Sequence, residues 1–155
     1  MIVRHLLRAT TVFMLSLSVL HAFSYENEVR ISVGMNGGGA IFFELKSEGM
    51  KMVPVNTLSV IPGGATSWGR GKPSWRLELK PGSYIELDRV VYGESIPGFE
   101  STVAEELQPD IHYLVGVSGA GFAKGLEFYI SEDKSGRRVL HVCAAPKSHP
   151  NPACE

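Results

Sequence analysis

The chain has 155 residues, a formal net charge of −1 at pH 7 and 44% hydrophobic residues. This length fits one domain that can bury a core without help from disulfides, and the lack of a basic excess argues against nucleic acid as a partner. Seventeen glycines and nine prolines are spread along the chain and separate short apolar segments. This punctuation favours an all-β protein.

The first segment in chain order predicts a cleaved secretory signal peptide. A short basic head is followed by the apolar stretch 9–20, which is shorter than the about 20 residues that a membrane-spanning helix needs. Small residues at Ala22 and Ser24 suit a cut after Ser24, with a cut after Ala22 as the alternative. We expect residues 1–24 to be removed, which lowers the net charge from −1 to −3. The remaining protein should be periplasmic or secreted, with no stable membrane insertion.

Alternating apolar and polar residues predict antiparallel strands along the rest of the chain. The predicted strands cover residues 29–33, 41–46, 74–80, 84–92, 111–117, 126–130 and 139–143. The alternation shifts phase at Asp88-Arg89, which indicates a bulge or an edge. The segment Lys80-Pro81-Gly82-Ser83 fits a type II turn. Helical periodicity is absent apart from a possible turn at 102–107.

A short motif that enters one of these strands consists of Leu107, Pro109, Tyr113, Val115 and Val117. It resembles the tyrosine corner of fibronectin type III and immunoglobulin-like domains, in which a tyrosine hydroxyl bonds back to the preceding connection. Together with the strands, the resemblance implies that residues 25–143 form an antiparallel, immunoglobulin-like β-sandwich of about seven to nine strands. The wider run from Val91 to Phe128 is similar to small uncharacterised exported proteins of Gram-negative bacteria, which implies no particular activity.

The two cysteines, Cys143 and Cys154, predict a disulfide bridge, because an even number of cysteines in an oxidising compartment usually pairs. The bridge would tie the proline-rich tail 144–155 to the domain and contribute about 2 to 3 kcal/mol through loop closure. A zinc or copper site made of these cysteines with His141 and His149 is the alternative. The spacing matches no standard zinc pattern, so we expect no metal.

The glycine-rich segment 114–125 comes close to two catalytic motifs. Gly119-x-Gly121 lacks the third small residue of a dinucleotide loop, because Lys124 stands at that position. Ser118 lies in a near match to the nucleophile elbow Gly-x-Ser-x-Gly, but no helical pattern follows it. We therefore expect a glycine-rich hairpin and no cofactor.

The segment Pro62–Trp75 is the best candidate for a binding site. It is longer than a hairpin needs, and it combines four glycines with Trp68, Arg70 and Lys72. The indole and the two cations could stack on a sugar ring or bind a carboxylate or phosphate of a protein or envelope glycan. Alternatively, Trp68 folds back as a structural cap. The alternation of Trp75 with the leucines that follow it places Trp75 in the core.

These patterns favour a non-enzymatic exported protein, an accessory, adaptor or inhibitor that recognises a protein or a cell-envelope component. Two alternatives remain open. One is a purely structural envelope component. The other is a small secreted hydrolase that uses Ser118 or the acids Glu105, Glu106, Asp110, Glu132 and Asp133, whose linear spacing does not establish a catalytic geometry.

Overall fold

The computed structural model describes residues 28–64 and 71–143, which form an all-β fold with antiparallel sheets and no helix. Seven strands of five residues or more are β1 (Val29–Met35), β2 (Ile41–Ser47), β4 (Thr57–Pro62), β5 (Trp75–Leu79), β9 (His112–Gly119), β10 (Phe122–Glu132) and β11 (Arg138–Val142). Four shorter ones are β3 (Val53–Pro54), β6 (Glu86–Leu87), β7 (Arg89–Val91) and β8 (Phe99–Ser101). The described residues therefore contain eleven strands, so the expected number of seven to nine is not confirmed.

The predicted signal peptide (residues 1–24) and the tail (residues 144–155) lie outside these described ranges. Within the ranges, no helix has the length and hydropathy that a membrane crossing requires.

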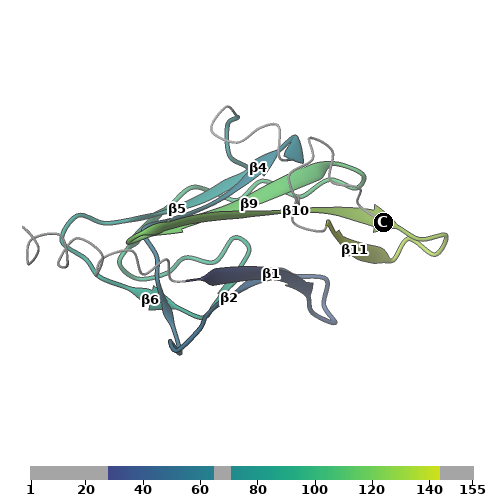
Figure 1. Cartoon of the computed structure of the whole chain (residues 1–155). Coiled ribbons are helices and arrows are strands. Elements are labelled where there is room, and N and C mark those ends of the chain that lie inside the picture. The colour runs from purple at the N-terminus through teal and green to yellow at the C-terminus, as the bar shows by residue number, and fades with distance from the viewer. Residues whose placement is uncertain (1–27, 65–70, 144–155) are drawn as a thin grey trace, which may run out of the picture.

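The strands are arranged in three sheets. A six-stranded sheet has the order β11-β10-β9-β4-β5-β8, a three-stranded sheet has the order β1-β2-β7, and β3 pairs with β6. Figure 1 shows β1 and β2 across from β9 and β10, and β1 contacts β10. The two larger sheets therefore face each other over part of their area.

Aromatic side chains fill the space between these two sheets. Phe43 of β2 is tilted against Phe128 of β10 with ring centroids 6.0 Å apart, and Tyr113 of β9 stacks on Phe128 at 5.8 Å. Trp75 is fully buried, which confirms the prediction from the alternation in β5. Its indole Nε1 donates a hydrogen bond to Ser101 Oγ at 3.2 Å. Because side chains alternate along a strand, the polar residues of β4, β5 and β9 are left on the outer face of the large sheet.

The region predicted as one strand at 84–92 forms two short strands with different partners. Strand β6 pairs with β3, whereas β7 pairs with β2. Between them, the backbone N–H of Leu45 donates to the carbonyl of Asp88 at 2.8 Å. The phase shift at Asp88-Arg89 therefore marks the point at which the chain moves from one sheet to another. The preceding turn matches the prediction, since Gly82 has a φ of 78° and Ser83 N–H donates to the Lys80 carbonyl at 3.0 Å.

The glycine-rich segment is a β-hairpin. Strand β9 ends at Gly119 and β10 begins at Phe122, with Gly121 in the left-handed region at a φ of 82°. A two-residue turn joins β9 directly to β10, and Ser118 lies within β9 rather than at a turn between a strand and a helix. This arrangement confirms the expected hairpin and excludes the geometry of a dinucleotide loop or a nucleophile elbow at this segment.

Strand β4 is the main element that the sequence pattern does not predict. It lies between β9 and β5 in the six-stranded sheet, ends at Pro62 and begins three residues after Pro54 of the short strand β3. Its inward residues are Leu58 and Val60, both fully buried, and its outward residues include Thr57 and Ser59. Such a short alternation, close to two prolines, resembles a loop in sequence.

The tyrosine motif makes the contact that its pattern predicts. Tyr113 is buried, and its hydroxyl oxygen accepts a hydrogen bond from the backbone N–H of Gln108 at 2.9 Å. Leu107 in the same connection is also buried. The contact anchors the connection before β9 to the core.

We predict that Tyr92 makes stability pH-dependent. Its hydroxyl donates to the Glu105 carbonyl at 2.7 Å and lies 3.3 Å from the Ser74 carbonyl. Burial, with smaller effects of Tyr113 and Glu105, raises its pKa from 10.0 to about 12. The neutral phenol therefore stabilises the fold below pH 10, and this stabilisation is lost as the pH rises from 10 through about 12.

Urea denaturation across this pH range tests the prediction. Tyr92→Phe should lower stability by about 1 kcal/mol at neutral pH and lose less further stability above pH 10 than the wild type. Tyr84→Phe is the comparison variant. That side chain is 73% exposed, and its pKa is raised chiefly by the hydrogen bond to Glu86 rather than by burial, so we expect it to change the alkaline slope less than Tyr92→Phe does. An identical alkaline slope in the wild type and Tyr92→Phe would contradict the assignment.

Candidate functional site

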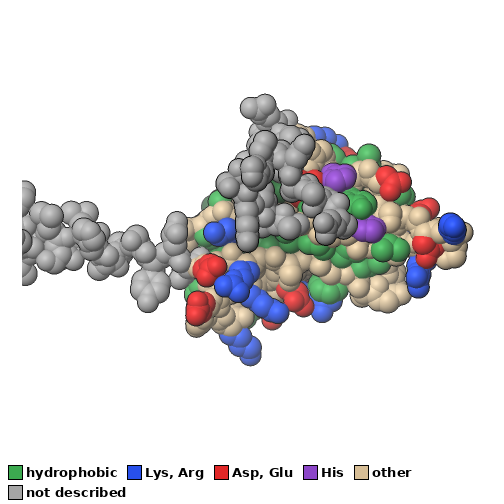
Figure 2. Space-filling view, turned by 45° about the vertical axis from the view of Figure 1, so that its right-hand side comes forward, with side chains coloured by type: hydrophobic (Ala, Val, Ile, Leu, Met, Phe, Trp, Pro, Cys, Tyr) green, Lys and Arg blue, Asp and Glu red, His purple; other side chains and the backbone are tan. Residues whose placement is uncertain are grey.

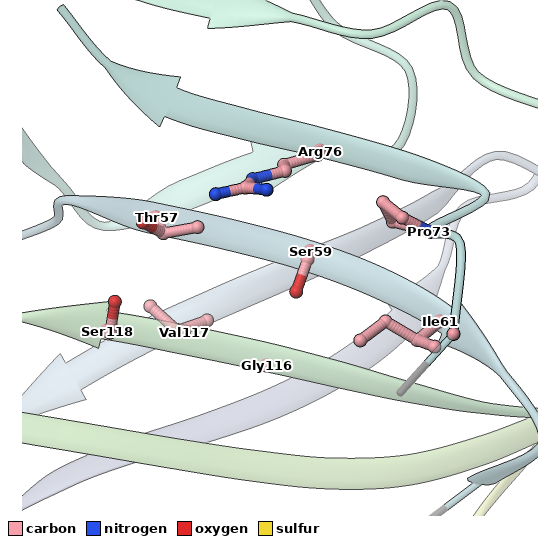
Figure 3. A pocket seen from close by; sticks show the side chains of 9 residues that line it. Thr57, Ser59, Ile61, Pro73, Arg76, Gly116, Val117 and Ser118 are labelled. Atoms are coloured by element: carbon pink, nitrogen blue, oxygen red, sulfur yellow. The ribbon is translucent and has the colours of Figure 1, made fainter. Parts of the chain in front are cut away.

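The outer face of the six-stranded sheet carries a groove of about 330 Å³. Strands β4, β5 and β9 contribute its polar side chains, which are Thr57, Ser59, Ser118 and Arg76. Figure 3 shows Thr57 and Ser118 at one end of the groove and Ile61 and Pro73 at the opposite end. Ser59 and Arg76 lie between the two ends. The groove thus combines one guanidinium and three hydroxyls with an aliphatic wall.

The register of the sheet brings these residues together. Ser59 of β4 lies opposite both Arg76 of β5 and Gly116 of β9, and Thr57 lies opposite Ser118. Residues opposite each other in antiparallel strands share one face, so the three strands form a row across the sheet. Gly116 has no side chain, which leaves space beside the Ser59 hydroxyl.

Arg76 is the only charged residue among the described residues that line the groove. Its Nη2 lies 3.0 Å from Glu78 Oε2, and the two side chains are 42% and 58% exposed. An exposed pair of this kind contributes about 1 kcal/mol or less. The Nε of Arg76 is buried and has no hydrogen-bond partner within the described part of the chain. A buried donor without a partner is costly, and a bound ligand could satisfy it.

The described residues include the two ends of the predicted binding segment Pro62–Trp75. Trp68 and Arg70 lie outside the described residues. The side chain of Lys72 is 84% exposed, and its Nζ pairs with Glu105 Oε1 at 2.7 Å. The hydrogen bond and charge of Glu105 raise the pKa of Lys72. Lys72 does not line the groove, although its neighbours Gly71 and Pro73 do.

A row of stacked rings crosses the same outer face nearby. The Tyr129 ring of β10 lies between His112 of β9 and His141 of β11, with centroid distances of 4.8 and 4.4 Å. His112 is exposed. Its Nδ1 lies 2.6 Å from Glu127 Oε1, a partner that sequence spacing alone does not reveal. This pairing depends on the register between β9 and β10.

Ligand atoms of His112, Glu127 and Cys143 lie within 4.8 Å of one another, a spacing that could hold a metal ion. This set differs from the metal alternative in the sequence, in which His141 accompanies the cysteines. A site of this kind needs the thiolate of Cys143, and a bridge to Cys154 would consume it. Cys143 is 1% exposed, whereas Cys154 lies outside the described residues, so the bridge stays a prediction.

The acids considered for a hydrolase do not line the groove in the described residues. Glu105 is paired with Lys72, and Asp133 accepts hydrogen bonds from Ser135 and Arg137 in a turn. The hydrogen bond from the Ser135 side chain and those from the backbone hold the pKa of Asp133 below its ordinary value. These two carboxylates therefore have separate local partners.

Charges of both signs are mixed on the visible surface. Figure 2 shows lysine and arginine side chains interspersed with aspartate and glutamate, and histidines among hydrophobic side chains. No broad field of one sign covers this face of the described residues.

Comparison of the chain with protein-family models, curated proteins and solved structures finds no match. The resemblance to immunoglobulin-like domains and to exported bacterial proteins therefore stays a prediction.

We predict that the unreduced protein has no reactive thiol, because Cys143 and Cys154 form a bridge. Thiol titration of the unfolded, unreduced protein should give no reaction, and titration after reduction should give two thiols for the two cysteines. Cys154→Ser should lower stability by about 2 to 3 kcal/mol under oxidising conditions. Two thiols in the unreduced protein would contradict the bridge and would make zinc titration of His112, Glu127 and Cys143 the next measurement.

Proposed function

We propose that this protein is an exported, non-enzymatic binding protein that acts as an accessory, adaptor or inhibitor and recognises a protein or an envelope component. The groove on the outer face of the large sheet carries the proposal. It offers a guanidinium and three hydroxyls to a ligand, and its described lining contains no Asp, Glu or His that could transfer a proton.

Export is part of this proposal and is supported by the sequence. The basic head, the apolar stretch 9–20 and the small residues before Tyr25 have the layout of a signal peptide. A periplasmic or secreted location also agrees with the proposed bridge between Cys143 and Cys154.

The finer architecture that we propose is an immunoglobulin-like β-sandwich. Two facing sheets and the hydrogen bond between Tyr113 and Gln108 support it. Such domains commonly bind partners through exposed loops or sheet surfaces, and the end of the predicted segment Pro62–Trp75 reaches the groove at Gly71 and Pro73. Trp68 and Arg70 remain the proposed contacts of that segment, with Lys72 at its exposed end.

A photo-crosslinking residue at Thr57 tests the binding proposal. In cells that naturally make the protein, we expect position 57 to capture a partner, because Thr57 lines the groove. The matched control carries the same residue at Arg30 in β1, whose side chain is 75% exposed and lies on the other sheet. Ser59→Leu, which fills the groove, should abolish crosslinking from position 57.

Two results would contradict the proposal. The first is crosslinking that is absent at position 57, or equal at positions 57 and 30. The second is turnover of chromogenic esters or glycosides by the purified protein that is lost in Ser118→Ala, since this would support the hydrolase.

A further inference from the structure

The chemistry of the groove narrows the class of ligand. Among the described residues, its lining offers Arg76 as the one charged side chain, beside the hydroxyls of Thr57, Ser59 and Ser118. None of these hydroxyls is engaged in a hydrogen bond within the described residues. A ligand group that complements this lining carries negative charge and accepts hydrogen bonds.

We infer that the groove binds a carboxylate of a protein partner, supplied by an Asp or Glu side chain or by the free C-terminus of an extended peptide segment. This inference rests on the proposed binding function and specifies its ligand. A planar guanidinium pairs with a carboxylate through two parallel N–H donors, which gives both strength and direction.

Arg76 has a donor without a partner. Its buried Nε lacks a hydrogen-bond partner in the described residues, and its Nη2 lies beside Glu78. The side chain is 42% exposed, and a turn of the guanidinium toward the groove would let a carboxylate accept hydrogen bonds from Nε and Nη2 together. The Ser59 hydroxyl lies opposite Arg76 in the register and can donate to the second oxygen. Glu78 has the same charge as the ligand and therefore competes with it.

We take an acidic peptide as the occupant, because the described lining sets the aliphatic side chains of Ile61 and Pro73 beside Arg76 and the hydroxyls. A peptide segment can offer apolar side chains and a carboxylate to these two parts of the lining together. The volume of about 330 Å³ lies at the lower end of the range for small-molecule sites, which is about 300 to 1,000 Å³. It suits a few side chains of a segment that lies across the open face of the sheet.

A library of short random peptides on beads, screened with the purified full chain, tests the inference. We expect the selected peptides to share an Asp, a Glu or a free terminal carboxylate. The tightest peptide is then compared with its isostere, in which that carboxylate is an amide, by fluorescence anisotropy. The amide should bind about tenfold more weakly.

A double-mutant cycle then assigns the contact to Arg76. Arg76→Gln should weaken binding of the acidic peptide by about tenfold and should not weaken binding of the amide peptide further. Glu78→Gln should tighten binding of the acidic peptide, because it removes the competing carboxylate. Arg30→Gln is the matched control, since Arg30 also has an exposed ion pair, with Glu28 at 3.3 Å, but lies on the other sheet. It should leave binding unchanged.

Equal binding of the acidic and amide peptides, or independent losses from Arg76→Gln and the amide, would overturn the inference. Selection of no acidic peptide, with binding of glucuronate instead, would overturn it in favour of an acidic sugar. If Arg76→Gln does not fold, Ser59→Leu still tests the site, because it should block the acidic peptide while Arg76 is retained. If no acidic peptide binds but position 57 still crosslinks to a partner, only the ligand class is rejected. If no acidic peptide binds and position 57 captures no partner, the binding function is rejected as well.

Discussion

Aromatic contact between the two facing sheets determines which side of each strand faces solvent. Phe128 lies at its centre, tilted against Phe43 of the opposite sheet and stacked with Tyr113 of its own. Because successive side chains point to opposite faces of a strand, seating Tyr113 inward sends Gly116 and Ser118 outward. A one-residue slip of β9 would reverse these positions and bury a hydroxyl. The groove therefore depends on the same register that fills the core.

The groove also depends on the order of the strands in the large sheet. Arg76, Ser59 and Gly116 form one row only because β4 lies between β5 and β9, although β9 follows β4 by about fifty residues in the sequence. A site assembled in this way has no local sequence motif. In the sequence, each residue of the groove is only an outward-facing residue of its own strand. The pairing of β4 with β5 and β9 brings these residues together.

Features that depend on a local pattern could be predicted from the sequence, whereas features that depend on the pairing of distant strands could not. Strict alternation identified β1, β2, β5 and β9, and it placed Trp75 inside the protein, because each of these features is local. The sequence pattern did not identify β4, because its short apolar alternation lies close to two prolines. It also predicted β6 and β7 as one strand, because the change of pairing strand at Asp88 depends on distant parts of the chain. The sequence predicted a binding site in the segment that contains Lys72. Arg76 was predicted only as a polar residue on the outer side of a half-buried strand.

The exposed ion pair of Arg76 and Glu78 agrees with the reversible binding that we propose. Both side chains are about half exposed, so their attraction is weakened by water and an incoming carboxylate can replace it at little cost. Nucleophilic catalysis at Ser118 would instead need an imidazole or carboxylate held against the hydroxyl. The nearest candidate by register, His112, lies farther along β9, where it is engaged with Glu127 and Tyr129. Among the described residues, the groove therefore holds a cation beside hydroxyls and lies apart from the imidazoles, which agrees with the binding function that we propose.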